Sequence, residues 1–195
     1  MKKYSYFNLF RLVFLLVPSA FSFSNSKIEF ASEGVQLNIP TNAKFIIGHV
    51  RKLDEDKGSC FDVKSKVGKK FIGEFCFLSR NNGLSSVGIV PYGSIPDIAS
   101  RGEKPASDLV VTTGASYYPM ERFDINFQGA YAAKIDCDLD NGLIYRGTST
   151  CHVGLSKLDN GNFLYGFLVM KQDASKKNVF FASDVKKIWN LFTKI

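Results

Sequence analysis

The stretch that decides the fold is 60-CFDVKSKVGKKFIGEFC-76, in which two cysteines flank a turn containing glycine. If the turn is centred on Gly68, its two arms are symmetric and Cys60 faces Cys76 directly. Directly opposed residues of an antiparallel pair come close enough for a disulfide where they are not hydrogen-bonded to each other. The stretch therefore predicts a β-hairpin closed by a Cys60–Cys76 disulfide.

One detail opposes this register. It places Phe61 opposite Phe75, which favours an apolar face, but it also places Asp62 opposite Glu74. Like charges directly opposite each other destabilise a strand pair. We therefore predict a hairpin in which the carboxylates of Asp62 and Glu74 repel each other.

The two other cysteines are harder to place. A two-residue Asn141-Gly142 turn would bring Cys137 opposite Arg146 rather than opposite Cys151. Either the loop is longer and irregular, or the two cysteines meet from non-adjacent strands. Four cysteines allow three connectivities, and we prefer Cys137–Cys151 because it is the pair left by the first hairpin.

The first 24 residues have the order of a secretory signal peptide. Lys2, Lys3 and Arg11 supply a basic segment without acids, the run 12-LVFLLV-17 is apolar, and small residues follow in PSAFSFS. The apolar run is shorter than the roughly 20 residues that a membrane span needs. We expect cleavage near residue 24, a single disulfide-stapled β-rich domain over residues 25–195 with no membrane span, and a periplasmic or extracellular location.

Short segments rich in Phe, Val, Ile and Tyr recur along the chain, separated by Gly, Asn, Asp or Pro. This spacing is typical of antiparallel all-β proteins. We expect a mainly β fold, an antiparallel β-sandwich or barrel-like domain with one C-terminal amphipathic helix. The predicted strands are 27–30, 35–39, 44–50, 60–64, 71–78, 87–90, 109–113, 123–127, 131–135, 143–145, 152–155, 163–170 and 179–181.

A second tight turn is predicted at Asn160-Gly161. With a two-residue turn, Leu158 would face Phe163. The same register would carry Val153 to a position opposite Leu168 further along the strands.

One segment near the C-terminus has helical periodicity. Ser183 is placed to cap the helix, and Val185, Ile188, Trp189 and Phe192 fall on one face. We expect this face to pack on a sheet. A helix that binds a membrane surface or a partner is the alternative.

The charge of the chain does not indicate a nucleic-acid partner. Removing the leader leaves 22 basic residues against 18 acidic ones, a net charge of +4 in place of +7. Basic residues do not cluster with interleaved aromatics. We therefore expect no nucleic acid among the partners.

The stretch 136-DCDLDNG-142 resembles the start of a calcium loop, with Asp136, Asp138 and Asp140 at alternate positions. An EF-hand would have Gly and Glu where Asn141 and Gly147 stand. We predict a hairpin tip, because Asp-Asn-Gly is itself a good turn sequence. A looser calcium site on the three aspartates is the alternative.

The segment 91-PYGSIPDIASRGEKP-105 holds three prolines and several charges and predicts a long loop. Loops on a rigid scaffold often carry binding surfaces. The candidate partner-binding residues are Tyr92, Ile95, Asp97, Arg101, Glu103 and Lys104. A plain connector is the alternative interpretation.

Patterns that would indicate catalysis are weak. The only histidines are His49 and His152, Cys151 is expected to be oxidised, and no G-x-S-x-G motif is present. We therefore predict an exported protein that binds another protein, as an inhibitor or immunity-type protein does, rather than an enzyme. The alternatives are a structural or assembly component of a cell-surface or secretion apparatus, and a secreted hydrolase or carbohydrate-binding domain.

Overall fold

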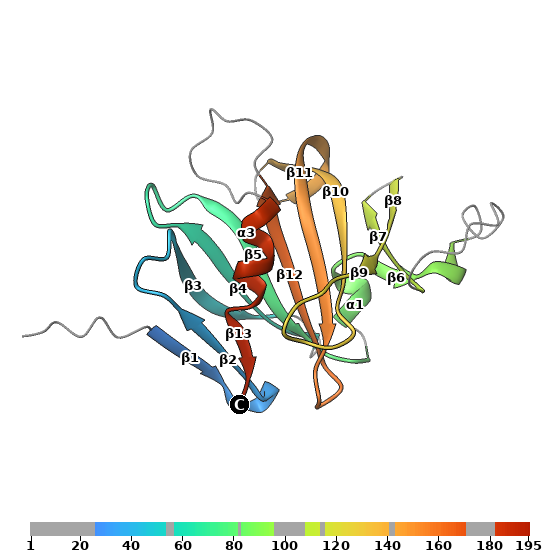
Figure 1. The fold of residues 1–195 in the computed structure, drawn as a ribbon. Coiled ribbons are helices and arrows are strands. Elements are labelled where there is room, and N and C mark those ends of the chain that lie inside the picture. Colours follow the sequence, from blue (N-terminus) through green and yellow to red (C-terminus); the bar gives the residue numbers. More distant parts are fainter. Residues whose placement is uncertain are drawn as a thin grey trace, which may run out of the picture.

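Figure 1 shows the computed structural model of the chain. It describes residues 26–53, 57–81, 83–95, 108–113, 116–140, 143–170 and 182–195. The expected leader and the expected strand at 179–181 lie outside the described residues and stay predictions.

A seven-stranded antiparallel sheet occupies the centre of the molecule, with the strand order β3-β4-β5-β12-β11-β10-β9 (Figure 1). Side chains alternate between its two faces. Along β4, Phe61 belongs to one hydrophobic cluster and its neighbour Cys60 to the other. Both faces are therefore apolar and need cover. The strands are β3 (Phe45–Lys52), β4 (Gly58–Ser65), β5 (Phe71–Leu78), β9 (Glu121–Arg122), β10 (Tyr131–Asp140), β11 (Leu143–Lys157) and β12 (Phe163–Met170).

The first face is covered by a three-stranded sheet and a helix. The sheet has the order β1-β2-β13, and Leu37 and Phe192 from it pack in one cluster with Phe61 and Phe75 of the central sheet. The helix α3 lies across the middle strands (Figure 1). These elements are β1 (Ser26–Phe30), the 3-10 turn η1 (Ala31–Glu33), β2 (Val35–Ile39), α3 (Ala182–Trp189) and β13 (Phe192–Lys194).

The second face is covered by another three-stranded sheet, of order β6-β7-β8. Ile89 and Val111 from this sheet and the nearby Met120 pack in one cluster with all four cysteines. The elements are α1 (Gly83–Ser86), β6 (Ile89–Pro91), the 3-10 turn η3 (Tyr92–Ser94), β7 (Leu109–Thr113) and β8 (Ser116–Pro119). The prediction of a mainly β, antiparallel, sandwich-like fold with a C-terminal helix is confirmed.

The Cys60–Cys76 hairpin has the predicted register. Cys60 pairs with Cys76 across β4 and β5, Phe61 pairs with Phe75, and the two cysteines form a disulfide with their Cα atoms 4.0 Å apart. Beyond Val63 the register shifts at a bulge. The local symmetry of the turn sequence was therefore sufficient to predict this disulfide.

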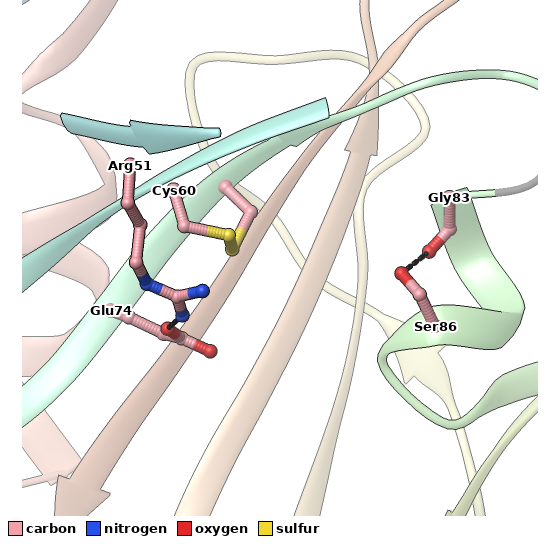
Figure 2. The surroundings of a disulfide bond; sticks show 6 residues. Arg51, Cys60, Glu74, Gly83 and Ser86 are labelled. Atoms are coloured by element: carbon pink, nitrogen blue, oxygen red, sulfur yellow. Dashed lines mark hydrogen bonds and ion pairs between the residues drawn. A yellow bond between two sulfur atoms is a disulfide. The ribbon is translucent and has the colours of Figure 1, made fainter. Parts of the chain in front are cut away.

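The conflict between Asp62 and Glu74 is real, and neighbouring cations resolve it. The two residues are paired as predicted. Arg51 on β3 reaches Glu74 with a 2.6 Å charge-assisted hydrogen bond beside the disulfide (Figure 2), and Lys64 lies 3.5 Å from Asp62. Each carboxylate therefore has its own cation, which offsets the repulsion between them.

The Cys137–Cys151 disulfide also forms as predicted, with a Cα–Cα distance of 5.8 Å. Its strands β10 and β11 are adjacent, so the alternative of non-adjacent strands is wrong. The hairpin begins with the two-residue connection, Asp140 opposite Leu143, and then shifts register between Cys137 and Asp138. The shift leaves Cys137 opposite Ser149, and Cys151 lies two residues further along the same face.

The predicted two-residue turn at Asn160-Gly161 is wrong by one residue. Leu158 does not pair with Phe163; its N–H donates instead to the carbonyl of Asn162, at 2.8 Å. The loop thus has three residues, and its last residue, Gly161, takes a positive φ of 88°, as in a hairpin that ends in a left-handed glycine.

This change of turn type alters the whole β11–β12 pair. Val153 pairs with Phe167 rather than with Leu168. A shift of one residue exchanges the two faces of a strand. Phe167 accordingly packs with Val153 on the disulfide side, while Leu168 lies in the cluster on the helix side.

The C-terminal helix is docked on the sheet by the predicted face. Val185, Ile188 and Trp189 are buried, as expected. Two details differ: α3 begins at Ala182, so Ser183 lies inside its first turn rather than before it, and Phe192 is buried from strand β13 rather than from the helix.

The strand predicted at 123–127 is wrong. The chain leaves β9 after Arg122 and forms a loop, residues 123–130, before β10 begins. The backbone N–H of Asn126 donates to the Asn190 side chain at 3.0 Å, and the Asn126 amide donates to the Asn190 carbonyl at 3.1 Å. The loop is thus anchored to the end of α3 instead of pairing with a strand.

Among the described residues, none of the helices combines the length and the apolar character that a membrane span requires.

Trp189 attaches the helix to the sheet through two glycines. It is fully buried, and its indole lies against Gly154 and Gly166, which pair across β11 and β12. A Cβ atom added at either glycine would overlap the indole ring. These glycines are required for space, since neither has a positive φ.

We predict that Gly154→Ala or Gly166→Ala lowers the free energy of unfolding by about 1–3 kcal/mol, because the added methyl overpacks the core. Urea unfolding measures the change. Gly93→Ala is the matched control, since a Cβ there meets no atom within 4 Å. Equal stability of all three variants would contradict the account of Trp189.

Candidate binding groove

A groove of about 460 Å³ lies where the edge of the central sheet meets α3 and the segment from β8 to the 123–130 loop. At this edge β9 pairs with only two residues of β10, Tyr131 and Ala132, so the following residue positions of β10 border the groove. A hollow of this size is at the small end of ligand sites, which measure about 300–1,000 Å³.

The floor of the groove contains His152. It lies on the helix-facing side of β11, directly opposite Lys134 of β10 and next to Leu168 of β12. Its side chain is only 6% exposed. The ring of Phe123 packs on the imidazole with the ring centres 5.0 Å apart.

His152 is neutral at pH 7. Burial, with a smaller contribution from the positive charge of Lys134, lowers its pKa from 6.5 to about 4. Its Nδ1 atom is buried and has no hydrogen-bond partner among the described residues. A buried polar atom without a partner is unusual, and His152 combines it with a place in the lining of the groove.

One wall of the groove comes from α3. Val185 is buried and Lys186 is exposed, and both line the groove. The ammonium group of Lys186 lies 2.7 Å from the carboxylate of Asp124, and this cation lowers the pKa of Asp124. Together with the Asn126–Asn190 hydrogen bonds, this ion pair holds the 123–130 loop against the helix.

The opposite wall comes from β8 and β9. Tyr118, Glu121 and Arg122 line it, and the Tyr118 hydroxyl lies 3.4 Å from a carboxylate oxygen of Asp136. Glu121 is the one acidic residue among the described residues that line the groove, whereas Arg122, Lys134 and Lys186 are basic. The rim is therefore positively charged above a floor of Phe123, His152, Met170 and Val185.

The candidate calcium ligands are only partly described. Asp136 is exposed on β10. The backbones of Asp138 and Asp140 belong to the same strand, but their side chains lie outside the described residues. Calcium binding by these three carboxylates stays a prediction.

The candidate partner-binding loop is also described in part. Tyr92 lies in η3, and Ile95 is buried with 6% of its surface exposed. Asp97, Arg101, Glu103 and Lys104 lie outside the described residues. Ile95 therefore contributes to packing, and a contact role for the other residues stays a prediction.

Sequence reasoning missed the groove. It considered the two histidines, His49 and His152, only among weak patterns for catalysis. The available signal was the face that His152 shares with Gly154 and Ser156 on β11, where small and polar residues stand in an apolar strand. That pattern marks a face that accommodates something other than an ordinary aliphatic core, here Trp189 and the groove floor.

Comparison with protein-family models, with curated proteins and with solved structures finds no match to this chain. The functional argument therefore rests on the groove itself. It combines cations at the rim, an apolar floor and one neutral imidazole.

We predict that protonation of His152 destabilises the folded protein at low pH. Its pKa is lower in the folded chain, about 4, than the ordinary value of 6.5. The unfolded chain therefore binds more protons between these values, and stability falls as the pH drops from 6.5 to 4. The contribution is roughly 3 kcal/mol.

Urea unfolding of wild type and His152→Gln between pH 4 and 7.5 isolates this term from the carboxylates that titrate in the same range. The variant should lose the part of the pH dependence that belongs to His152. His49→Gln, at an exposed position of β3, is the control and should keep it. Identical slopes for the wild type and the His152 variant would contradict the prediction.

Proposed function

We propose that this chain is an exported binding protein that holds an acidic and apolar segment of another protein in the groove. The observation that carries the proposal is the combination of Arg122, Lys134 and Lys186 around an apolar floor that contains a neutral histidine. In an inhibitor or immunity-type protein, such a groove would engage and block a partner. The 91–105 loop stays a second predicted contact surface.

The two disulfides support an oxidising location. Cys60–Cys76 and Cys137–Cys151 are both formed, and structural disulfides persist mainly outside the cytosol. Together with the signal-like first 24 residues, they support a periplasmic or extracellular site of action.

The described residues give less support to a role as a structural or assembly component than to the proposed binding function. That alternative would be supported by a protruding terminal helix or a smooth unpaired edge strand. α3 is docked by its apolar face. β3 is an edge of the central sheet, but its register shifts between Ile47 and Val50, and the exposed Arg51 and Lys52 follow. Bulges and charges of this kind oppose edge-to-edge pairing.

A hydrolase is also favoured less. Acyl transfer by a hydroxyl or thiol nucleophile needs an activated Ser, Thr or Cys, and glycoside hydrolysis needs two placed carboxylates. The described lining of the groove has no Ser, Thr or Cys, and Glu121 is its one carboxylate. The lining therefore supports binding over catalysis. Carbohydrate binding is a separate alternative, which the capture experiment below distinguishes.

We predict that the full chain, exported to an oxidising compartment and used as bait in the native envelope or secreted fraction, captures a partner in a groove-dependent way. Lys134→Glu combined with Lys186→Glu should reduce capture by at least about tenfold, because it replaces attraction by repulsion at the rim. Quantitative mass spectrometry measures capture. A purified 1:1 complex that blocks the partner's activity would complete the case.

The matched control is Lys66→Glu combined with Lys70→Glu, which changes the charge equally on the exposed β4–β5 turn outside the groove. This variant should capture the partner as the wild type does. If both double variants lost capture equally, the loss would be an effect of net charge and would contradict a role of the groove. Capture of oligosaccharide in place of protein would move the function to carbohydrate binding.

A further inference from the structure

The groove combines charge and apolar surface at short range. Lys134 is the cross-strand neighbour of His152, and Phe123 packs on the His152 ring. A ligand in the groove therefore meets a cation and an apolar surface at nearly the same place. An Asp side chain supplies a carboxylate without an apolar group, and a Leu side chain supplies an apolar group without a carboxylate. Neither side chain alone therefore matches both features of the groove.

The cations of the rim are available to an anion. Neither Arg122 nor Lys134 forms an ion pair within the part of the chain that the structure describes, and the exposed Lys186 carries three N–H donors, of which Asp124 occupies one side. The charged groups around the groove are Glu121 and Arg122 on β9, Asp124 in the loop, Lys134 and Asp136 on β10 and Lys186 on α3.

His152 gives the site its second, independent feature. It is nine-tenths buried in the floor of the groove, and its Nδ1 has no partner among the described residues. Since the ring is neutral at pH 7, it adds no charge to the floor of the groove. A ligand seated here is thus recognised by fixed polar and apolar groups beneath a cationic rim.

We propose that the groove binds the C-terminal residue of a partner chain, where that residue is apolar and its carboxylate is free. A chain end carries a carboxylate and an apolar side chain on one Cα atom, which is the combination that Lys134 and the floor of Phe123, Val185 and Met170 accept together. Capture of a terminal carboxylate is an established mode of peptide recognition. This inference rests on the proposed function and specifies which part of the partner enters the groove.

The walls of the groove are held in place by contacts within the protein, which supports recognition of one kind of chain end. The 123–130 loop is held on α3 by the Asn126–Asn190 hydrogen bonds and the Lys186–Asp124 ion pair. Trp189 packs against Phe123 with the ring centres 6.0 Å apart. The walls are therefore set before a ligand arrives, which lowers the entropy that binding must overcome.

The test uses acetylated tetrapeptides that end in Ala-Ala-Leu or Ala-Ala-Phe, each as the free acid and as the C-terminal amide. Calorimetry or fluorescence titration of the full chain should show binding of the free acids and at least about tenfold weaker binding of the amides, because an amide cannot form the charge-assisted contact. Equal binding of acid and amide, or no binding, would overturn the proposal.

A spectroscopic readout follows from the two histidines of the chain. A carboxylate near His152 favours its protonated form, so the free-acid peptide should raise the pH midpoint of one imidazole signal and leave the signal of the exposed His49 in place. Lys134→Met should weaken peptide binding by about tenfold, while Lys134→Arg should retain most of it and Lys66→Met should have no effect. Equal weakening by Lys134→Met and Lys66→Met would overturn the proposal.

Two outcomes separate this inference from the proposed function. If a partner protein is captured through the groove but the free-acid peptides neither bind nor compete, the proposed function stands and the C-terminal inference is wrong. If the peptides bind but no partner protein is captured, the inference stands without the proposed function. If hexanoate or phenylacetate binds as tightly as the peptides do, the ligand is a free organic acid and the assignment to a chain end is overturned.

Discussion

The contact between Trp189 and the paired glycines Gly154 and Gly166 is the interaction on which the rest of this structure depends. The seven-stranded sheet has apolar residues on both faces, and a helix can approach one face closely only where side chains are missing. The two glycines provide that place side by side on β11 and β12. The indole fills it, and Phe75 meets the indole edge-on at 5.2 Å.

The groove is a consequence of this contact. Because Trp189 fixes the end of α3 on the sheet, Asn190 is in position to hold the 123–130 loop through Asn126. The loop in turn places Phe123 between Trp189 and His152. A structural contact in the core thus becomes a wall of the candidate site, and the positions of His152 and Lys134 on adjacent strands complete it.

The opposite face of the sheet is held together differently. Both disulfides lie there, packed with the small β6-β7-β8 sheet. The pair of carboxylates Asp62 and Glu74 lies on this face as well, stabilised by Lys64 and Arg51. Covalent links and ion pairs therefore support one face, whereas aromatic packing of Trp189, Phe75 and Phe61 supports the other.

The sequence by itself determined the features that depend on neighbouring residues in the chain. Alternation and turn residues identified β3, β4, β5, β10, β11 and β12 of the central sheet, the symmetry about Gly68 placed Cys60 opposite Cys76, and helical spacing identified the buried face of α3. Only the tertiary structure decided what depends on distant residues: the extra residue in the turn at Gly161, the bulge beyond Cys137, and the capture of the 123–130 loop by Asn190. The groove belongs to this second group, because Lys134, His152 and Lys186 meet only after three separate elements have packed, and no local pattern specifies that meeting.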